Sequence, residues 1–165
     1  MDLWIMAFVG GLVGSVFMDI MEMYMGKFGI YSGVKGTHIG RWAHGLVKGD
    51  FYYQNIDEVA PVDNEMRIAF IFHYLVGGGI VALGYPVILY FLDVSTMVMH
   101  IPLAVIYGLL TCTFPWFILM PSIGKGVAGN KMPEQASPII APIVSHLAYG
   151  LGIGVTLFAY GWAIT

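Results

Sequence analysis

The sequence is poor in cysteine and in charged residues. Cys112 is the only cysteine, which excludes an internal disulfide and a metal cluster held by several thiolates. Charged residues make up 10% of the 165 residues, whereas soluble domains carry about a quarter. The net charge is −3 and the isoelectric point is near 5.9. The chain therefore lacks the basic surface that binds nucleic acid, and no nucleic-acid partner is expected.

The chain is rich in hydrophobic residues, and many of them lie in long stretches. Hydrophobic residues make up 58% of the chain, and the mean hydropathy is +0.79. Four apolar stretches are long enough to cross a hydrocarbon core of about 30 Å, at about 3–25, 64–92, 95–120 and 137–163. The first has no basic segment before it and no cleavage site of small residues, so we interpret it as a retained span. The sequence predicts an all-α, polytopic membrane protein, a single domain over residues 1–165 that forms a four-helix bundle in lipid.

The first polar loop contains a short amphipathic segment. Between residues 37 and 48, Ile39, Trp42 and Leu46 recur at helical spacing, and Arg41 falls on another side. This pattern predicts a short helix that lies at the membrane interface.

Lysine and arginine are unevenly distributed. All seven lie in, or at the edges of, the loops after the first and third spans: Lys27, Lys35, Arg41, Lys48, Arg67, Lys125 and Lys131. The loop after the second span and both termini have none. Because basic loops stay in the cytoplasm, both termini are predicted on the outer side of the membrane.

Asp19 is the most costly residue of the first span. An ionisable group inside an apolar helix by default marks a functional site. Gly11, Ser15, Asp19 and Glu22 follow one another at helical spacing and form one stripe. Because small residues four apart let another helix come close, this stripe is expected to face protein.

Polar residues of the other spans match Asp19 in depth. Each lies eight residues from the basic-loop end of its span, about 10–13 Å inward: Asp19, His73, Thr113 and His146. Glu65 stands at the start of the second span. Matched depth predicts one polar layer shared by the bundle, where such folds place their sites.

This layer suits a cation. Asp19, Glu22, His73 and His146 supply two carboxylates and two imidazoles, a set that can hold a divalent transition metal or relay protons. The predicted function is the binding or translocation of a small cation, with Glu65 and Thr113 as accompanying groups. The alternative is a structural hydrogen-bond layer, in which a histidine or a threonine hydroxyl only stabilises Asp19.

Haem b bound between His73 and His146 is a second functional alternative. Histidine pairs on facing helices hold haem in membrane cytochromes, which is an analogy at the level of the fold. Glycines follow both histidines and could leave room for a porphyrin: Gly77, Gly78, Gly79, Gly150, Gly152 and Gly154.

A non-catalytic role is the third alternative. The glycine faces and the aromatic residues, 15% of the chain, could pack against other membrane subunits or a second copy. No enzyme is indicated, because no nucleophile and base stand together; Ser145 and His146 are adjacent and point to different sides of a helix. His38 and His44 are interpreted as surface histidines.

Several short motifs occur in a fixed order along the chain: Met18-Asp19, Gly40-Arg41-Trp42, Gly49-Asp50-Phe51, Ile56, Pro61, Glu65, His73-Tyr74-x2-Gly77, Met120-Pro121-x2-Gly124-x-Gly126, Pro133 and His146-x3-Gly150-x-Gly152. Over nearly the whole chain they resemble a bacterial family of small inner-membrane proteins, the domain-of-unknown-function family numbered 2938. The resemblance implies a bacterial inner-membrane location and supports the choice of Asp19, Glu65, His73 and His146. It implies no reaction.

Overall fold

The computed structural model describes residues 3–92 and 96–164. These residues form helices joined by turns and contain no β-strand. Four helical stretches are long and apolar enough to cross a membrane: Leu3–Gly26, Glu65–Leu92, His100–Ser122 and Ile140–Gly161. The prediction of an all-α bundle with four spans is confirmed.

Two of the spans are single helices and two are interrupted. The uninterrupted spans are α1 (Leu3–Gly26) and α7 (Ile140–Ile164). The second span consists of α3 (Glu65–Ile71), a π-helical segment (Phe72–Ile80) and α4 (Gly84–Leu92). The third consists of α5 (His100–Thr111), a second π-helical segment (Pro115–Leu119) and α6 (Met120–Ser122).

The connections carry one further helix and three short turns. The predicted loop helix is present as α2 (Gly36–Lys48), and 3₁₀ turns lie at Ile56–Glu58, Met97–Met99 and Val127–Gly129. The fourth span begins at residue 140 rather than 137. Ser137 precedes it in a loop, where its N–H donates to the Tyr31 carbonyl at 2.8 Å. The third begins at 100 rather than 95, a position outside the described residues.

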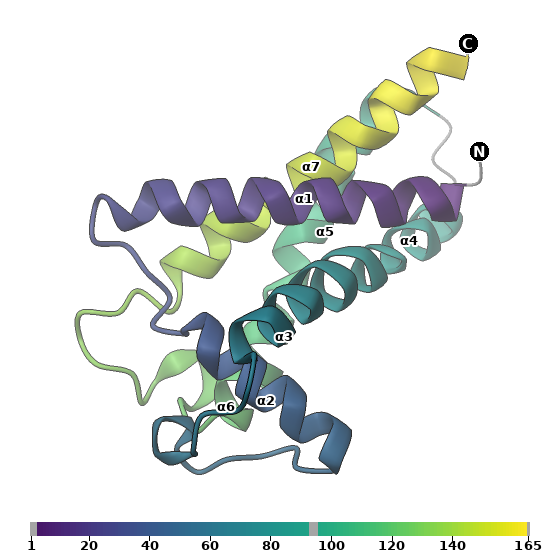
Figure 1. The fold of residues 1–165 in the computed structure, drawn as a ribbon. Coiled ribbons are helices and arrows are strands. Elements are labelled where there is room, and N and C mark those ends of the chain that lie inside the picture. The colour runs from purple at the N-terminus through teal and green to yellow at the C-terminus, as the bar shows by residue number, and fades with distance from the viewer. Residues whose placement is uncertain (1–2, 93–95, 165) are drawn as a thin grey trace.

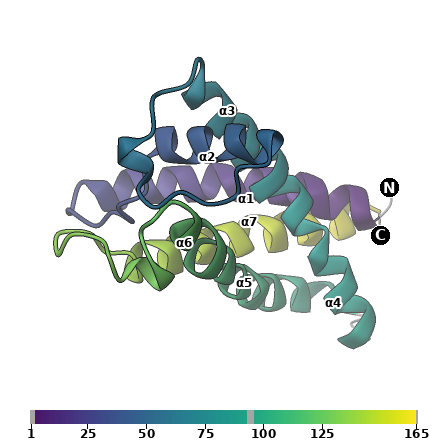
Figure 2. The same ribbon diagram turned by 90° about the horizontal axis from the view of Figure 1, so that it is seen from below.

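The spans cross at an angle and do not form a parallel bundle. α1 packs along α7, α7 packs against α5, and the π-helical segment of the second span packs against α1. Both termini lie at one end of the molecule, whereas α2, α6 and the long loops lie at the other (Figures 1 and 2). All the lysines and arginines therefore gather at the end that carries α2.

Glycines make the helix crossings possible. A Cβ atom added at Gly11 would overlap the carbonyl oxygen of Gly78 in the second span, and one at Gly152 would lie 2.5 Å from the Cα of Gly14. Backbones that come this close gain van der Waals contact, which drives helix association in lipid. Gly11 and Ser15 of the predicted stripe face the second span, whereas Asp19 and Glu22 of the same stripe are exposed.

Replacing Gly11 with Ala should destabilise the bundle by about 1–3 kcal/mol, because the added methyl group forces the two helices apart. Gly77→Ala is the matched control, since the atom nearest to its Cβ would be the Phe72 carbonyl oxygen at 3.9 Å. Thermal unfolding in detergent should give a lower midpoint for Gly11→Ala and an unchanged or higher one for Gly77→Ala. Equal midpoints would contradict the close contact with Gly78.

Residues 36–62, which comprise α2 and the loop after it, form a cap over this end of the bundle. Arg41 fixes the cap to the second span: its guanidinium donates to both carboxylate oxygens of Glu65, at 2.8 Å and 3.1 Å. The same group donates to the carbonyl oxygens of Ile56 at 3.1 Å and Val59 at 2.9 Å. The planar fork of arginine thus joins α2, the loop and α3 at one point.

Asp57 is the second anchor of the cap. Its carboxylate accepts hydrogen bonds from His38 Nε2, at 3.0 Å, and from Lys125 in the loop after the third span. Lys35 Nζ lies 3.9 Å away. The hydrogen bond from Lys125 lowers the pKa of Asp57 below its ordinary value.

His38 is 2% exposed, so its interpretation as a surface histidine was wrong. Its Nδ1 accepts from the backbone N–H of Lys35 at 3.3 Å, while Nε2 faces Asp57. A neutral imidazole with its proton on Nε2 satisfies both contacts. Burial lowers the pKa of His38, and the neighbouring Asp57 carboxylate opposes the shift only in part.

Candidate functional site

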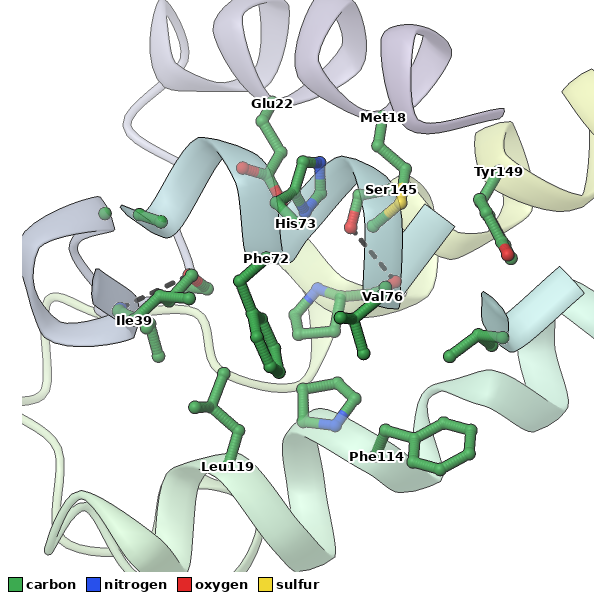
Figure 3. Close-up of a pocket in the computed structure, with 18 of the residues that line it drawn as sticks. Met18, Glu22, Ile39, Phe72, His73, Val76, Phe114, Leu119, Ser145 and Tyr149 are labelled. Atoms are coloured by element: carbon green, nitrogen blue, oxygen red, sulfur yellow. Dashed lines mark hydrogen bonds between the residues drawn. The ribbon is translucent and has the colours of Figure 1, made fainter. Parts of the chain in front are cut away.

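A cleft of about 530 Å³ lies at the cap end of the bundle, and residues of all four spans and of α2 line it. Polar groups gather on one side of the cleft and apolar groups on the other. Figure 3 shows Glu22 and Met18 extending from α1, with His73 and Ser145 close to them, whereas Leu119 and Phe114 belong to the third span across the cleft. Phe72 comes from the second span beside His73 and points toward the third span. The cleft is therefore amphipathic.

Asp19 and His73 form the centre of the polar side. His73 Nε2 lies 3.2 Å from Asp19 Oδ1, and the Tyr74 hydroxyl donates to Asp19 Oδ2 at 2.6 Å. The His73 nitrogen is close to the carboxylate but poorly aligned with it, and this buried atom has no hydrogen-bond partner among the described residues. The Asp19 side chain is 48% exposed. Asp19 thus stands exposed at the rim of the cleft, and His73 Nε2 is buried beside it.

Glu22 extends the acidic side of the cleft by one helical turn. It lies close enough to Asp19 and His73 to interact with both charges, and it contacts Ser145 on α7. Neither lysine nor arginine forms an ion pair with it in the described part of the chain. Glu22 therefore adds a second carboxylate without a fixed counter-charge.

His146 enters the cleft from α7. Its Nδ1 lies 2.7 Å from the Thr111 hydroxyl, and that hydroxyl donates its single proton to the Gly108 carbonyl at 2.6 Å. Because the hydroxyl proton is already used, His146 must donate through Nδ1, which leaves Nε2 as the proton acceptor. Thr111 thus fixes the tautomer and the orientation of the ring.

The structure brings Asp19, Glu22, His73 and His146 to one cleft. Thr113, the predicted partner on the third span, is exposed outside the cleft and donates to the Leu110 carbonyl at 2.8 Å. Depth along a helix does not give the direction in which a side chain points, so the structure does not bring Thr113 to the other three residues of the predicted layer.

Glu65 also lies outside the cleft lining. Its carboxylate pairs with the Arg41 guanidinium and accepts a hydrogen bond from the backbone N–H of Val62 at 3.3 Å. Glu65, predicted as an accompanying group of the site, thus anchors the cap in the structure.

Three cleft residues were missed by the sequence analysis: Tyr74, Thr111 and Tyr149. Thr111 has a recognisable signal, since it stands three residues after Gly108 and therefore on the face that packs against α7. Tyr149 donates to the carbonyl oxygen of Gly78 at 2.6 Å, at the end of the π-helical segment. π-Helical segments often occur at functional sites, but no sequence pattern predicts this one.

The glycines beyond His146 do not leave space for a porphyrin. Added Cβ atoms at Gly152 and Gly154 would meet Gly14 and Ile101, so helix backbones fill those positions. After His73, Gly78 and Gly79 contact α1 in the same way, and only Gly77 faces open space. Within the described residues, no three His, Cys, Asp or Glu side chains come together in a group that could hold a metal ion.

A comparison with protein families bears on this arrangement. One family profile, described as a protein of unknown function (DUF2938), matches residues 8–160. The chain belongs to the DUF2938 family. The match includes α1 from residue 8 onward, the cap and all the residues that line the cleft, so the site lies within the matched part of the chain. No curated protein and no solved structure matches this DUF2938 chain.

Proposed function

We propose that this DUF2938 protein is an integral membrane protein that binds a proton at the Asp19–His73 pair and passes it through the bundle. The observation that carries the proposal is the 3.2 Å approach of His73 Nε2 to Asp19 in the wall of an intramembrane cleft. An imidazole beside a carboxylate can take up and release a proton near neutral pH. Ionisable residues that face a cavity inside a membrane commonly serve such relays.

The geometry favours a proton over a metal ion as the cation. The two carboxylates and two imidazoles line the same cleft, yet among the described residues they do not group into a set of three that could ligate one metal. A proton needs only one acceptor at a time. His146, with Nε2 free to accept, is the second acceptor in the same cleft.

A series of polar side chains supports passage beyond the cleft. Tyr149 follows His146 at a ring separation of 6.3 Å, and Tyr85 lies 5.6 Å from the ring of Tyr107. The Tyr85 hydroxyl is in turn 3.3 Å from Nδ1 of His100, at the start of the third span. In this proposal water molecules bridge the gaps between these groups, as they do between buried polar groups elsewhere.

The orientation of the site follows from the loop charges. The cleft lies at the end that carries all seven lysines and arginines, which the positive-inside rule assigns to the cytoplasm. In this proposal the Asp19 site therefore faces the cytoplasmic side of a bacterial inner membrane, and both termini lie on the outer side.

Proton flux into vesicles tests the proposal. The purified protein is placed in liposomes that contain a pH-sensitive dye, and a potassium gradient with valinomycin supplies the driving force. Wild-type vesicles should acidify or alkalinise faster than empty ones, and Asp19→Asn and His73→Gln should reduce the rate to that of empty vesicles. Glu134→Gln, which removes an exposed carboxylate far from the cleft lining, should retain the wild-type rate. A wild-type rate in Asp19→Asn would refute the proposal.

A further inference from the structure

The cleft is far larger than a proton site requires. Its volume of about 530 Å³ lies in the range of pockets that enclose small organic ligands. Protein interiors are close-packed, so a cleft of this size is a candidate site for a small organic ligand. The occupant has to match the chemistry of the walls.

The charge of the walls has one sign. The lining includes the carboxylates of Asp19 and Glu22, and none of its described residues is lysine or arginine. The Asp19 carboxylate lies beside His73 and accepts a hydrogen bond from Tyr74, whereas Glu22 has no fixed counter-charge. In a low-dielectric environment this imbalance strongly favours a positively charged guest over an anionic one.

The remaining walls suit a flat or bulky apolar body. Six aromatic residues line the cleft: Trp42, Phe70, Phe72, Tyr74, Phe114 and Tyr149. Aromatic faces attract organic cations as well as apolar groups. Glu22, His73 and Ser145 lie toward α1, whereas Phe114 and Leu119 belong to the third span across the cleft, and Phe72 of the second span points toward them (Figure 3). A guest would thus place its charge near Glu22 and its body against the third span.

We infer that the cleft binds a monovalent organic cation with an aromatic or aliphatic body, and that this cation displaces a proton from the Asp19–Glu22 side. The inference rests on the proposed proton site, because the cation and the proton share the same carboxylates. The exchange balances: one positive charge enters the cleft and one proton leaves it. Exchange of this kind would couple movement of the cation to the proton gradient.

Titration calorimetry on the protein in lipid nanodiscs tests this inference. The probe is tetraphenylphosphonium, and its control is tetraphenylborate, which has the same shape and the opposite charge. The phosphonium should bind, the borate should not, and the heat should vary with the ionisation enthalpy of the buffer because protons are released. Equal binding of the two ions would show that the cleft holds only apolar material, such as lipid chains, and would overturn the inference.

Two variants locate the binding. Glu22→Gln should raise the Kd of the phosphonium by at least about tenfold, since it removes the unpaired charge, and Glu134→Gln should leave the Kd unchanged. Gly77→Phe should fill the cleft and abolish binding. Its unfolding midpoint should fall less than that of Gly11→Ala, because a Cβ atom at Gly77 would meet only the Phe72 carbonyl oxygen, at 3.9 Å. Unaltered affinity in both Glu22→Gln and Gly77→Phe would place the guest elsewhere and refute the inference.

The flux assay separates the two proposals. Proton flux that depends on Asp19, together with no phosphonium binding, would leave the proton function standing and reject the organic cation. If the wild-type protein shows neither proton flux nor phosphonium binding, both proposals are rejected.

Discussion

Replacing Arg41 with Ala should release the cap from the bundle. The guanidinium makes four hydrogen bonds that connect α2 with Glu65 and with the loop carbonyls of Ile56 and Val59. The Arg41 and Glu65 side chains are 10% and 14% exposed, so water cannot readily replace these contacts. Removal of the cation leaves the Glu65 carboxylate with the Val62 N–H as its donor and without a counter-charge, and it takes a donor from two loop carbonyl oxygens. This loss is more costly than that of an exposed pair.

Amide hydrogen exchange measures this release. The N–H of Tyr53 donates to Ser122 at 2.7 Å, and that of Ile56 donates to Ile123 at 3.2 Å; both bonds exist only when the cap is docked. Their protection should fall by about tenfold or more in Arg41→Ala. Lysine carries the charge but lacks the planar fork, so Arg41→Lys should restore only part of the protection.

Arg67→Ala is the matched control. Arg67 is exposed in the first turn of α3, close to the same helix end, and its removal should leave both amides protected. Equal loss of protection in the two alanine variants would show that general charge near α3, and not the Arg41 contacts, holds the cap. Because Ile39 and Trp42 of α2 line the cleft, a released cap should also expose the mouth of the site.

The spans were predictable because the length of each hydrophobic stretch can be read directly from the sequence. A helix of apolar residues must satisfy its backbone polar groups internally, so composition alone indicates where each span lies. The unequal distribution of lysine and arginine likewise anticipated that two loops share one end. The π-helical segments were not predictable, since they depend on contacts such as the Tyr149 hydroxyl at Gly78, which joins residues 71 positions apart.

The sequence predicted the depth of the site residues along their spans, but not the direction in which each side chain points. Counting residues from the loops placed Asp19, His73 and His146 at one level, and the structure puts all three in one cleft. The same count selected Thr113 in place of Thr111. Two residues apart on a helix are rotated by about 200°, so these two side chains point to nearly opposite sides. A count along the chain cannot tell which of them faces the cleft.

The cap was the least predictable part. The position of His38 on an amphipathic helix suggested exposure, because nothing nearby in the sequence marks Asp57, 19 residues later, as its partner. Lys125 reaches the same carboxylate from 68 residues away. Only the folded loops bring these charges together, and in doing so they remove His38 from water.

Acidification should loosen the cap in two stages. The pKa of His38 is lowered from 6.5 by burial, and the pKa of Asp57 is lowered from 3.8, chiefly by the hydrogen bond from Lys125. In both cases the docked state binds fewer protons than the released state, so docking is favoured at high pH and weakens as pH falls. The first loss should begin below about pH 6.5, as His38 protonates in the released state, and the second below about pH 4.

Protection factors of the Tyr53 and Ile56 amides between pH 7.5 and pH 3.5, corrected for intrinsic exchange, should show both stages. Protonation of His38 is opposed by more than burial, since its Nδ1 must then give up the N–H of Lys35, and both Lys35 and Lys125 stand near the ring. His38→Gln should therefore remove the first stage and retain the second, whereas His44→Gln should retain both. Protection that stays constant from pH 7.5 down to pH 3.5 would contradict the role assigned to these anchors.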